Sequence, residues 1–561
     1  MGTSAAVSSG HPLSTLAGTL VLQQGGNAVD AAVAAALAGC VLQSDMVSFA
    51  GIACIQMHDP ASSETLSIAG VGHWPARASL EELRASCGRV PNDVRNGVVP
   101  GAPDAYITAL ERFGTWTFAR VAEHAIHLAR EGFAMYPFRY VHEREHAAFI
   151  ERTPSTREVF WPNGRPVRVG ELFRQPDLAR SLATLAAAEA GSANRAQGLN
   201  AVREAFYIGD LATQIDAFFT KNGGYLRKSD LSGYRVETSH SITGTFGDFE
   251  IAVCPFWSKG PMLLQILNML AEDDPRSLGH NSPAYIHLLT EALKLAFADR
   301  HAYYGDPRFV DVPADGLLSL EYGRARRTLI RRVEAWREMP PPGDPWRARA
   351  LSEHHVMPGS VASSVSQASD TSNLSVVDSN GMACSITFSD PLNYSPILPG
   401  TGLLVSNRGV QAWVDPEHPN RVRPGQRPLV TGNPVLVFER GKLRMALGSP
   451  GADVQVQAIL QVLFNVLLFG MDCQQAVEAP RFATYSHPNS FEPHGYEPGV
   501  LRVESTVAPD VRKELEDLGH TVVVWPAHDW RAGGIAVVAV DDDGMRSAGA
   551  DPRRENYALA W

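Results

Sequence analysis

Hydrophobic and polar positions along this chain alternate between a helical period and a strand period. The helical period dominates the first two thirds, and Asn27, after two glycines, is placed as an N-cap. From residue 371 onward the pattern mainly favours strands. The segments with a helical pattern are residues 13–24, 28–42, 102–113, 117–130, 283–300, 454–469 and 509–518.

The character of the sequence changes between residues 322 and 370. Prolines at 340–342 and a serine-rich run at 359–364 interrupt the regular pattern. We interpret residues near 340–370 as a flexible tail. Arginines also cluster before the prolines, and we interpret them as the solvated face of a helix; they are residues 324, 326, 327, 331 and 332.

The stretch from Asp370 to Asp378 and the polar turn behind it predict a buried strand, a turn and a second strand. The sequence reads DTSNLSVVD, SNG and MACSIT, with hydroxyl residues crowded at its start. A cut before Thr371 would give this residue both a hydroxyl nucleophile and a free α-amine. An α-amine has a pKa of about 7.7–8.0, so it can take up the hydroxyl proton near neutral pH. On these residues alone, the alternative is an ordinary hairpin with surface threonine and serine.

The same stretch resembles the processing site of the γ-glutamyltranspeptidase family. Each further matching segment is weak evidence by itself, but together they follow the family's order and cover nearly the whole chain. They are GGNAVDAA at 25–32, VPG at 99–101, LAREGF at 128–133, ADR at 298–300, GDP at 305–307, RPL at 427–429, GSPG at 448–451, APRF at 479–482 and DPR at 551–553.

This resemblance implies an α+β fold, the four-layer αββα arrangement of N-terminal-nucleophile hydrolases. Members of the family are made as one chain that cuts itself into a large and a small subunit. Here the large subunit would be residues 1–370 and the small subunit residues 371–561, with the cut between Asp370 and Thr371. No metal or cofactor is expected. The expected partners are the chain's own cleaved subunit and a small-molecule amide substrate, and a higher oligomer is left open.

The resemblance also implies roles for residues around the nucleophile. Ser389 falls where the family has a threonine that hydrogen-bonds the nucleophile, so it would orient Thr371. Gly451 and Ala452 fall where the family has two glycines whose backbone N–H groups bind the oxyanion. Alanine keeps that N–H group, although the backbone angles must then suit a residue with a Cβ.

The substrate pocket departs from the family pattern. Gln411 stands at the amine-binding aspartate, Arg408 at a neighbouring glutamine, and Thr431 at one of two serines that meet the substrate carboxylate. An α-ammonium beside Arg408 would be poorly bound, so γ-glutamyl transfer is disfavoured. Residues 404–409, LVSNRG, resemble instead the branch of oxamate amidohydrolase and cephalosporin acylase.

We therefore expect hydrolysis of an amide whose acyl group carries a carboxylate but no α-amine. Arg408 would hold that carboxylate in a bidentate grip. Two alternatives stay open: Arg408 as a structural ion pair, and a γ-glutamyltransferase or glutathione hydrolase.

Composition and charge narrow the class further. A chain of 561 residues that is 45% hydrophobic can bury a large core, and a net charge of −11 argues against nucleic-acid and anionic membrane surfaces. Six cysteines without CxxC spacing suggest neither a zinc ribbon nor a disulfide framework. The first residues lack a basic n-region, and no apolar run is long enough to span a membrane. A cytoplasmic location is therefore expected.

Two other classes compete with this interpretation. His142, Glu143 and His146 fit HExxH, in which two histidines one turn apart bind zinc and the glutamate is the base of a metalloprotease. No convincing third ligand follows, so we interpret this segment as an exposed, solvated helix. The second alternative is an inactive pseudoenzyme, because Asn373 and Leu374 replace the histidine and tyrosine of the family motif.

Overall fold

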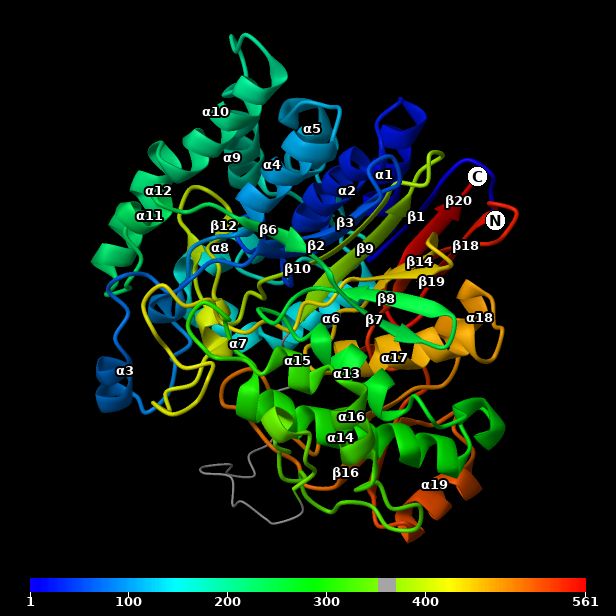
Figure 1. Ribbon diagram of the computed structural model, residues 1–561. Helices are drawn as coiled ribbons and strands as arrows, with labels where there is room; N and C mark the ends of the chain where they lie inside the picture. Colours follow the sequence, from blue (N-terminus) through cyan, green and yellow to red (C-terminus); the bar gives the residue numbers. More distant parts are fainter. Residues whose placement is uncertain (352–369) are drawn as a thin grey trace.

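The computed structural model describes residues 1–351 and 370–561. Two stacked sheets form its centre, and helices cover their outer faces (Figure 1). The predicted α+β class is confirmed. The serine-rich run at 359–364, expected in the flexible tail, lies outside the described residues.

The first sheet is antiparallel throughout and joins the two ends of the chain to its middle. The predicted hairpin occupies its centre and turns at Gly381, which has a φ of 83°. The prediction of strand, turn and strand is thus confirmed. In spatial order the strands are β20 (Tyr557–Ala560), β1 (Ala6–Ser9), β9 (Thr371–Val377), β10 (Ala383–Ser389), β2 (Ile52–Asp59), β3 (Glu64–Gly70) and β6 (Glu237–His240).

The second sheet is also antiparallel and lies against the first. A thin apolar layer fills the space between the sheets, with small residues such as Ala6, Ala252 and Ala446 among larger ones such as Phe438. Side chains of this size let the two sheets approach closely. The strand order is β19 (Arg546–Ala550), β18 (Ala536–Val540), β14 (Lys442–Gly448), β13 (Val435–Glu439), β8 (Phe249–Val253) and β7 (Ile242–Phe246).

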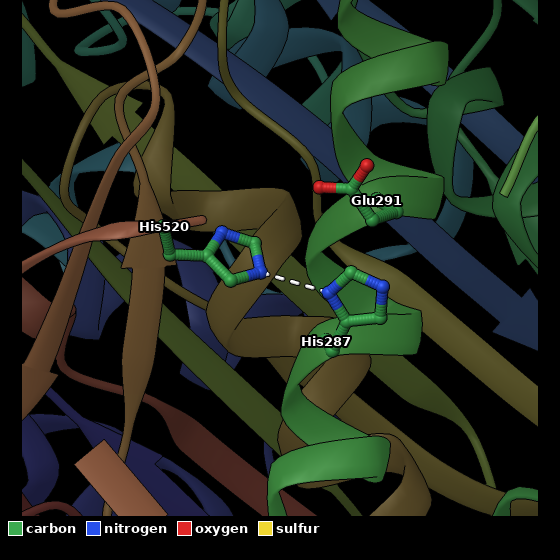
Figure 2. A group of neighbouring side chains, drawn as sticks. All are labelled: His287, Glu291 and His520. Carbon is green, nitrogen blue, oxygen red and sulfur yellow. Dashed lines mark hydrogen bonds between the residues drawn. The ribbon is translucent and has the colours of Figure 1, made fainter. Parts of the chain in front are cut away.

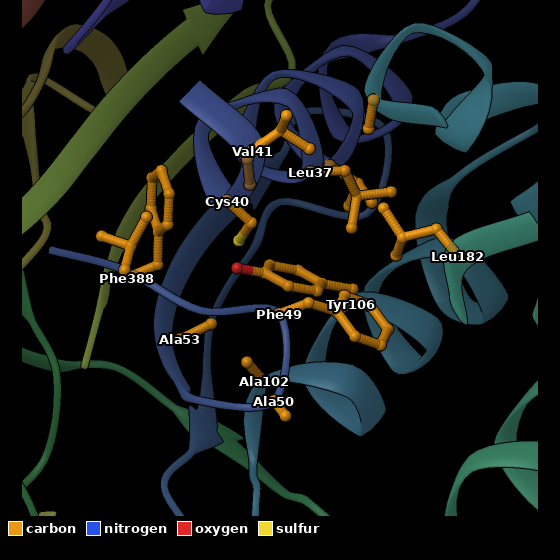
Figure 3. Packing of buried hydrophobic residues seen from close by; sticks show 14 of the residues in the cluster. Leu37, Cys40, Val41, Phe49, Ala50, Ala53, Ala102, Tyr106, Leu182 and Phe388 are labelled. Atoms are coloured by element: carbon orange, nitrogen blue, oxygen red, sulfur yellow. The ribbon is translucent and has the colours of Figure 1, made fainter. Parts of the chain in front are cut away.

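Helices on the first sheet form the larger of the two main cores. Every residue of α2 is buried, which explains why its sequence is apolar all round rather than amphipathic. Asn27 caps α2 as predicted, because its side chain accepts from the backbone N–H groups of Val29 and Asp30. Figure 3 shows Tyr106 of α4 packed between Cys40 and Phe49 in this core. The helices are α1 (Pro12–Gln23), α2 (Ala28–Leu42), α4 (Ala102–Phe113) and α5 (Phe118–Glu131).

Helices on the second sheet form the other large core. They are α13 (Pro261–Met269), α14 (Pro283–Tyr303), α17 (Val454–Leu467) and α18 (Cys473–Glu478). A small sheet of β15 (Phe482–Thr484), β16 (Val500–Glu504) and β17 (Thr521–Trp525) packs beside them with α19 (Pro509–Asp517). Further helices are α3 (Leu80–Ser86), α6 (Pro137–Glu145), α7 (Ala147–Arg152), α8 (Pro154–Phe160), α9 (Pro176–Ala187), α10 (Arg195–Tyr207), α11 (Asp210–Lys221), α12 (Lys228–Ser232), α15 (Ala314–Leu317) and α16 (Leu320–Arg327).

The arginine cluster is not uniformly solvated, so that expectation is wrong in part. Arg326 of α16 is fully buried and forms an ion pair with Asp299 over 3.2 Å. It also donates to the carbonyl oxygen of Pro341 over 3.0 Å. Arg324 and Arg331 are exposed as expected. The start of the supposed tail is therefore packed, because a buried guanidinium holds its backbone against α14.

Candidate active site

The first residue of β9 and the last residue of β10 face each other across the central hairpin, and both carry hydroxyl groups. Thr371 pairs with Ser389 in the register, and their hydroxyl oxygens are 2.9 Å apart. The Ser389 hydroxyl also donates to the backbone carbonyl oxygen of Asp370 over 2.9 Å. All three residues are buried. The structure thus brings the expected nucleophile, its expected partner and the bond before Thr371 together.

The Asp370 carbonyl oxygen sets the direction of these hydrogen bonds because it can only accept, and Arg408 adds a second donor to Ser389. The Arg408 Nη2 contacts the Ser389 hydroxyl oxygen, and a guanidinium can only donate. The one hydroxyl proton of Ser389 points to the Asp370 carbonyl oxygen, so Ser389 accepts from both Arg408 and Thr371. The hydroxyl proton of Thr371 therefore points at Ser389.

Arg408 is itself held by a buried carboxylate. Its Nε lies 3.2 Å from Asp390 Oδ1, and both side chains are almost completely buried. Asp390 also accepts from the backbone N–H of Asn407 over 3.0 Å. Burial raises the pKa of Asp390 despite the neighbouring guanidinium. The contacts of Arg408 match the structural ion pair that the sequence left open: Nε faces Asp390, and Nη2 is hydrogen-bonded to Ser389.

The backbone at Asp390 is strained. Its φ is 138°, a value that L-residues rarely adopt and that costs on the order of 1–3 kcal/mol. The Asp390 N–H donates to the carbonyl oxygen of Met46, which fixes this conformation from the other side. Asp390 directly follows Ser389, the last residue of β10, and this backbone conformation directs its carboxylate towards Arg408.

The carboxylate of Asp370 is held on the other side of the same bond. Its Oδ1 accepts from the Thr371 backbone N–H over 2.8 Å and from Arg554 over 2.6 Å. Arg554 lies over the rings of Phe138 and Trp530 and donates to the Trp530 carbonyl oxygen. The residue before Thr371 is therefore fixed by its side chain as well as by its carbonyl group.

Two of the sequence motifs supply a buried ion-pair network behind Arg554. Arg481 pairs with Asp551 in full burial. Arg553 pairs with Glu504 over 2.6 Å and with Asp551 over 3.2 Å. Charges buried in such a network must all be paired to be tolerated. The motifs at 479–482 and 551–553 thus have a structural role that positions the segment carrying Arg554.

Gly451 and Ala452 form the turn between β14 and α17. Their φ values are 111° and 51°, so both lie in the left-handed region. For alanine this conformation costs about 1–2 kcal/mol. Among the described residues, no acceptor takes a hydrogen bond from the backbone N–H of either residue. The turn therefore presents two free donors, as an oxyanion hole requires.

The other expected substrate-binding residues lie close in sequence to the site but make different contacts. Gln411 ends the short 3₁₀ helix η4 (Arg408–Gln411) and is buried, with no described partner for either amide atom. Thr431 is also buried, and its side chain meets the amide of Gln455. Arg408 and Gln411 thus face different neighbours: Arg408 meets the paired hydroxyls, and Gln411 faces a small cavity.

The HExxH segment is buried rather than exposed, which corrects the expectation from sequence. His142 Nδ1 lies 2.8 Å from Asp45, and Glu143 pairs with Arg139 over 2.6 Å. The pKa of His142 is raised although burial opposes this, because Asp45 accepts its hydrogen bond. Among the described residues, no third ligand joins His142 and His146 in a metal-binding arrangement. Polar side chains on a helix predicted solvation here, but His142 has a buried partner from another segment and Glu143 pairs with Arg139 within α6.

A different group of buried side chains has the composition of a metal site. Ligand atoms of His287, Glu291 and His520 all lie within 4.8 Å of one another (Figure 2). However, His287 donates through Nε2 to the Arg331 carbonyl oxygen, so its Nδ1 accepts from His520 over 2.9 Å. Glu291 accepts from the Lys294 ammonium over 2.8 Å. This cationic neighbour and the shared proton disfavour a metal ion, and we interpret the group as a hydrogen-bonded contact.

The same contact predicts that acid destabilises the fold. Burial lowers the pKa of His520 to about 2, whereas the pKa of an unfolded histidine is about 6.5. Below that value the unfolded chain binds a proton that the folded chain does not, so the free energy of unfolding falls as pH falls. The loss is about 1.4 kcal/mol per pH unit for one such histidine. Urea midpoints at pH 7.5 and 5.5 measure it.

A matched variant isolates His520 from other buried histidines whose pKa is also lowered, such as His487 and His494. His520→Gln keeps a side-chain donor but does not titrate. Its urea midpoint should therefore change less between the two pH values than that of the unaltered protein. Equal changes in both proteins would contradict the assignment.

Sequence reasoning missed Asp390 and Arg554. Asp390 directly follows Ser389, and Arg554 directly follows the DPR motif, so both lie beside segments that we had singled out. Their partners Arg408 and Asp370 are distant in sequence, and only the folded chain pairs them.

None of the helices in the described part of the chain is long and apolar enough to cross a membrane.

Two helix-covered sheets, with the paired hydroxyls of Thr371 and Ser389 at the open end of the central hairpin, are the features of an amidohydrolase of the N-terminal-nucleophile class. The chain belongs to the γ-glutamyltranspeptidase family, because the family model described as gamma-glutamyltranspeptidase matches residues 14–561.

Individual relatives match over the full length. The Acylase ACY 1 proenzyme of Pseudomonas sp. (strain V22) is 32% identical over 578 residues, which cover 100% of this chain and 94% of that protein. The glutathione hydrolase proenzyme of Bacillus subtilis (strain 168) is 28% identical, with 100% and 92% covered. The crystal structure of a cephalosporin acylase from Bacillus halodurans superimposes with a TM-score of 0.86 at 28% identity, with 100% and 96% covered.

Proposed function

We propose that this protein is an autoprocessing amidohydrolase that cuts itself between Asp370 and Thr371 and then uses Thr371 as its nucleophile. One observation carries the proposal. The Thr371 hydroxyl donates towards Ser389, and Ser389 donates to the carbonyl oxygen of Asp370. The hydroxyl that would attack and the carbonyl that would be attacked are thus joined through one side chain.

In the uncut chain, the Thr371 hydroxyl oxygen attacks the Asp370 carbonyl carbon. Its proton passes to Ser389 while the Ser389 proton passes on to the carbonyl oxygen, so Ser389 ends neutral. This proton then moves to the Thr371 nitrogen as the C–N bond breaks, which leaves an ester between the Asp370 carbonyl carbon and the Thr371 hydroxyl oxygen. Water hydrolyses this ester, which releases the Asp370 carboxylate and the free α-amine of Thr371.

In the cut protein, the α-amine of Thr371 acts as the base for its own hydroxyl. The hydroxyl oxygen attacks a substrate amide, the amine leaves, and water resolves the acyl-enzyme. The free N–H groups at Gly451 and Ala452 would bind the oxyanion in both steps. Ser389, held by Arg408, would keep the Thr371 side chain in its attacking rotamer.

After the cut, residues 1–370 and 371–561 would stay together as large and small subunits. The hairpin of the small subunit lies between β1 and β2 of the large subunit in one continuous sheet. Relatives named as proenzymes support such a heterodimer.

The proposed substrate is an amide whose acyl group carries a carboxylate and no α-amine. The acylase relatives support this branch. The neutral Gln411 at the expected amine-binding position supports it as well, because an ammonium group buried there would have no anion to pair with. A glutathione hydrolase is the alternative, supported by relatives of that name.

The purified protein tests the processing step directly. We expect a denaturing gel and intact mass measurement to give two polypeptides, one ending at Asp370 and one beginning at Thr371. The physical reason is that the precursor already holds the hydroxyl, its acceptor and the carbonyl within hydrogen-bond distance. A single uncut chain after prolonged incubation at neutral pH would contradict the proposal and favour a pseudoenzyme.

A further inference from the structure

A small cavity of about 20 Å³ lies beside Gln411, the last residue of η4. Gln411, Lys259 and Arg300 line it, together with the apolar side chains Trp413 and Leu429. Its volume is enough for one water-sized group, such as a carboxylate oxygen. Polar side chains that converge on a buried space of this kind are typical of a ligand subsite.

The cavity carries a net positive charge. Lys259 and Arg300 both pair with a single carboxylate, that of Asp453, over 2.9 Å and 2.7 Å. All three side chains are almost completely buried. Although burial alone would raise it, the pKa of Asp453 is lowered by these two cations. When Lys259 is protonated, two buried cations share one buried anion, and one positive charge is left without a partner.

The histidines around the cavity do not change its charge. Burial lowers the pKa of His301 to about 3 and that of His418 well below its usual value, so both are neutral near pH 7. His487 and His494, packed on the same cluster, are also lowered, each to about 4. The positive charge in this cavity therefore comes from Lys259 and Arg300.

Hydrogen-bonding capacity is left over at the same place. The ammonium of Lys259 can donate three hydrogen bonds, and Asp453 is its one acceptor among the described residues. The side-chain amide of Gln411 is 1% exposed and has no described partner for its nitrogen or its oxygen. A buried amide without partners is unfavourable, and a bound ligand would offset this cost.

The residues that line the cavity, or hold its lining residues, lie on the same segments as the candidate active site. Asp453, which holds Lys259, directly follows Ala452 of the expected oxyanion hole. Gln411 lies on the same short helix as Arg408, which contacts Ser389. Leu429 lies two residues before Thr431. The lining of the cavity is therefore joined directly to the segments that carry the Ser389 contact and the expected oxyanion hole.

We infer that Lys259 and the side-chain amide of Gln411 bind the distal carboxylate of the acyl group, so that the substrates are monoamides of dicarboxylic acids. This inference rests on the proposed function and assigns the carboxylate to Lys259 instead of Arg408. Lys259 pairs charge with the carboxylate, and Gln411 donates through Nε2. Trp413 and Leu429 form the apolar part of the cavity wall.

Two p-nitroanilides of equal length, glutaryl and pentanoyl, test the inference because they differ only in the distal carboxylate. In the unaltered protein the glutaryl compound should have the higher kcat/KM. Lys259→Met should lower the ratio of kcat/KM for glutaryl over pentanoyl by about 30-fold or more, as expected when one partner of a buried charge pair is lost. Lys294→Met is the matched control, because Lys294 is also a buried lysine paired with a carboxylate, and it should leave the ratio unchanged.

Gln411→Glu gives a second test of the carboxylate site and leaves Lys259 in place. A carboxylate at this position would repel the substrate carboxylate and lower the same ratio.

The ratio of kcat/KM for glutaryl over pentanoyl should also fall as pH rises through about 7 in the unaltered protein, since burial lowers the pKa of Lys259 to about 7. The pentanoyl compound serves as the reference at each pH, which removes the titration of the Thr371 amine from the comparison.

The outcomes separate this inference from the proposed function. An unchanged ratio in Lys259→Met, in a protein that has cut itself and hydrolyses both anilides, overturns the carboxylate assignment alone. Higher kcat/KM for the γ-glutamyl anilide than for the glutaryl anilide, with transfer to glycylglycine, also overturns it and favours the glutathione hydrolase alternative. A wild-type chain that stays uncut and hydrolyses none of the anilides overturns the proposed function itself.

Discussion

Thr371→Ala is expected to remain a single chain of 561 residues without measurable amidase activity. The variant lacks the hydroxyl that lies 2.9 Å from Ser389, so no group is left to attack the Asp370 carbonyl carbon. Catalysis by the α-amine is lost too, because that amine forms only when the chain is cut. The expected effect is complete on the gel and exceeds about 10³-fold in kcat/KM, as for other enzymes that lose their nucleophile.

Two neighbouring variants control for the fold. Thr371→Ser keeps the hydroxyl and should still process, more slowly, because the lost methyl group no longer restricts the side-chain rotamer. Ser372→Ala removes an adjacent buried hydroxyl that donates to Gln43 over 2.6 Å and should process like the unaltered protein. A Thr371→Ala chain that still splits at the same bond would show that another group makes the cut.

Local signals predicted the parts of this fold that depend on near neighbours in sequence. The helix at residues 28–42 has the predicted bounds, because Asn27 caps it and its alanine-rich sequence favours a buried helix. The hairpin that begins at Thr371 was also predicted, since its two strands are joined by a short polar turn. Thr371 and Ser389 were placed together through the family resemblance, and their register in the hairpin agrees.

Long-range pairing could not be predicted from the sequence. The central strand β9 has β1, from the first ten residues, as its neighbour, and β20 from the chain's end lies beyond β1. His142 and Arg326 were both interpreted as solvated, but each has a buried partner from another segment, Asp45 and Asp299. A polar helix looks the same in sequence whether its charges meet water or a distant carboxylate.

The expected substrate-binding residues also show that long-range pairing could not be predicted from the sequence. Arg408 and Gln411 are only three residues apart, and the sequence assigned both to one substrate-binding group. In the structure Arg408 is held by Asp390, whereas Gln411 faces the cavity of Lys259. No local pattern points to Lys259 here, because its partner Asp453 is distant in sequence.

Arg408→Met is expected to lower stability and to slow self-cleavage at the same time. Loss of the guanidinium leaves the Asp390 carboxylate buried without its partner, and breaking such a pair typically costs about 3–5 kcal/mol. Because burial already raises the pKa of Asp390, protonation will reduce that loss at lower pH. Ser389 would also lose the second donor that holds its hydroxyl against the Asp370 carbonyl oxygen. Urea unfolding measures the first effect, and the half-life of the precursor on a gel measures the second.

The double variant Asp390→Asn/Arg408→Met separates the two effects. Removal of both charges takes away the unpaired carboxylate, so much of the stability should return. Self-cleavage should stay slow, because Ser389 still lacks the second donor that holds its hydroxyl. If cleavage recovers together with stability, Arg408 acts only through folding. If the single variant cuts itself at the normal rate but has a raised KM for carboxylated amides, Arg408 is the substrate clamp first expected from the sequence, and the buried contacts with Asp390 and Ser389 must open when substrate binds.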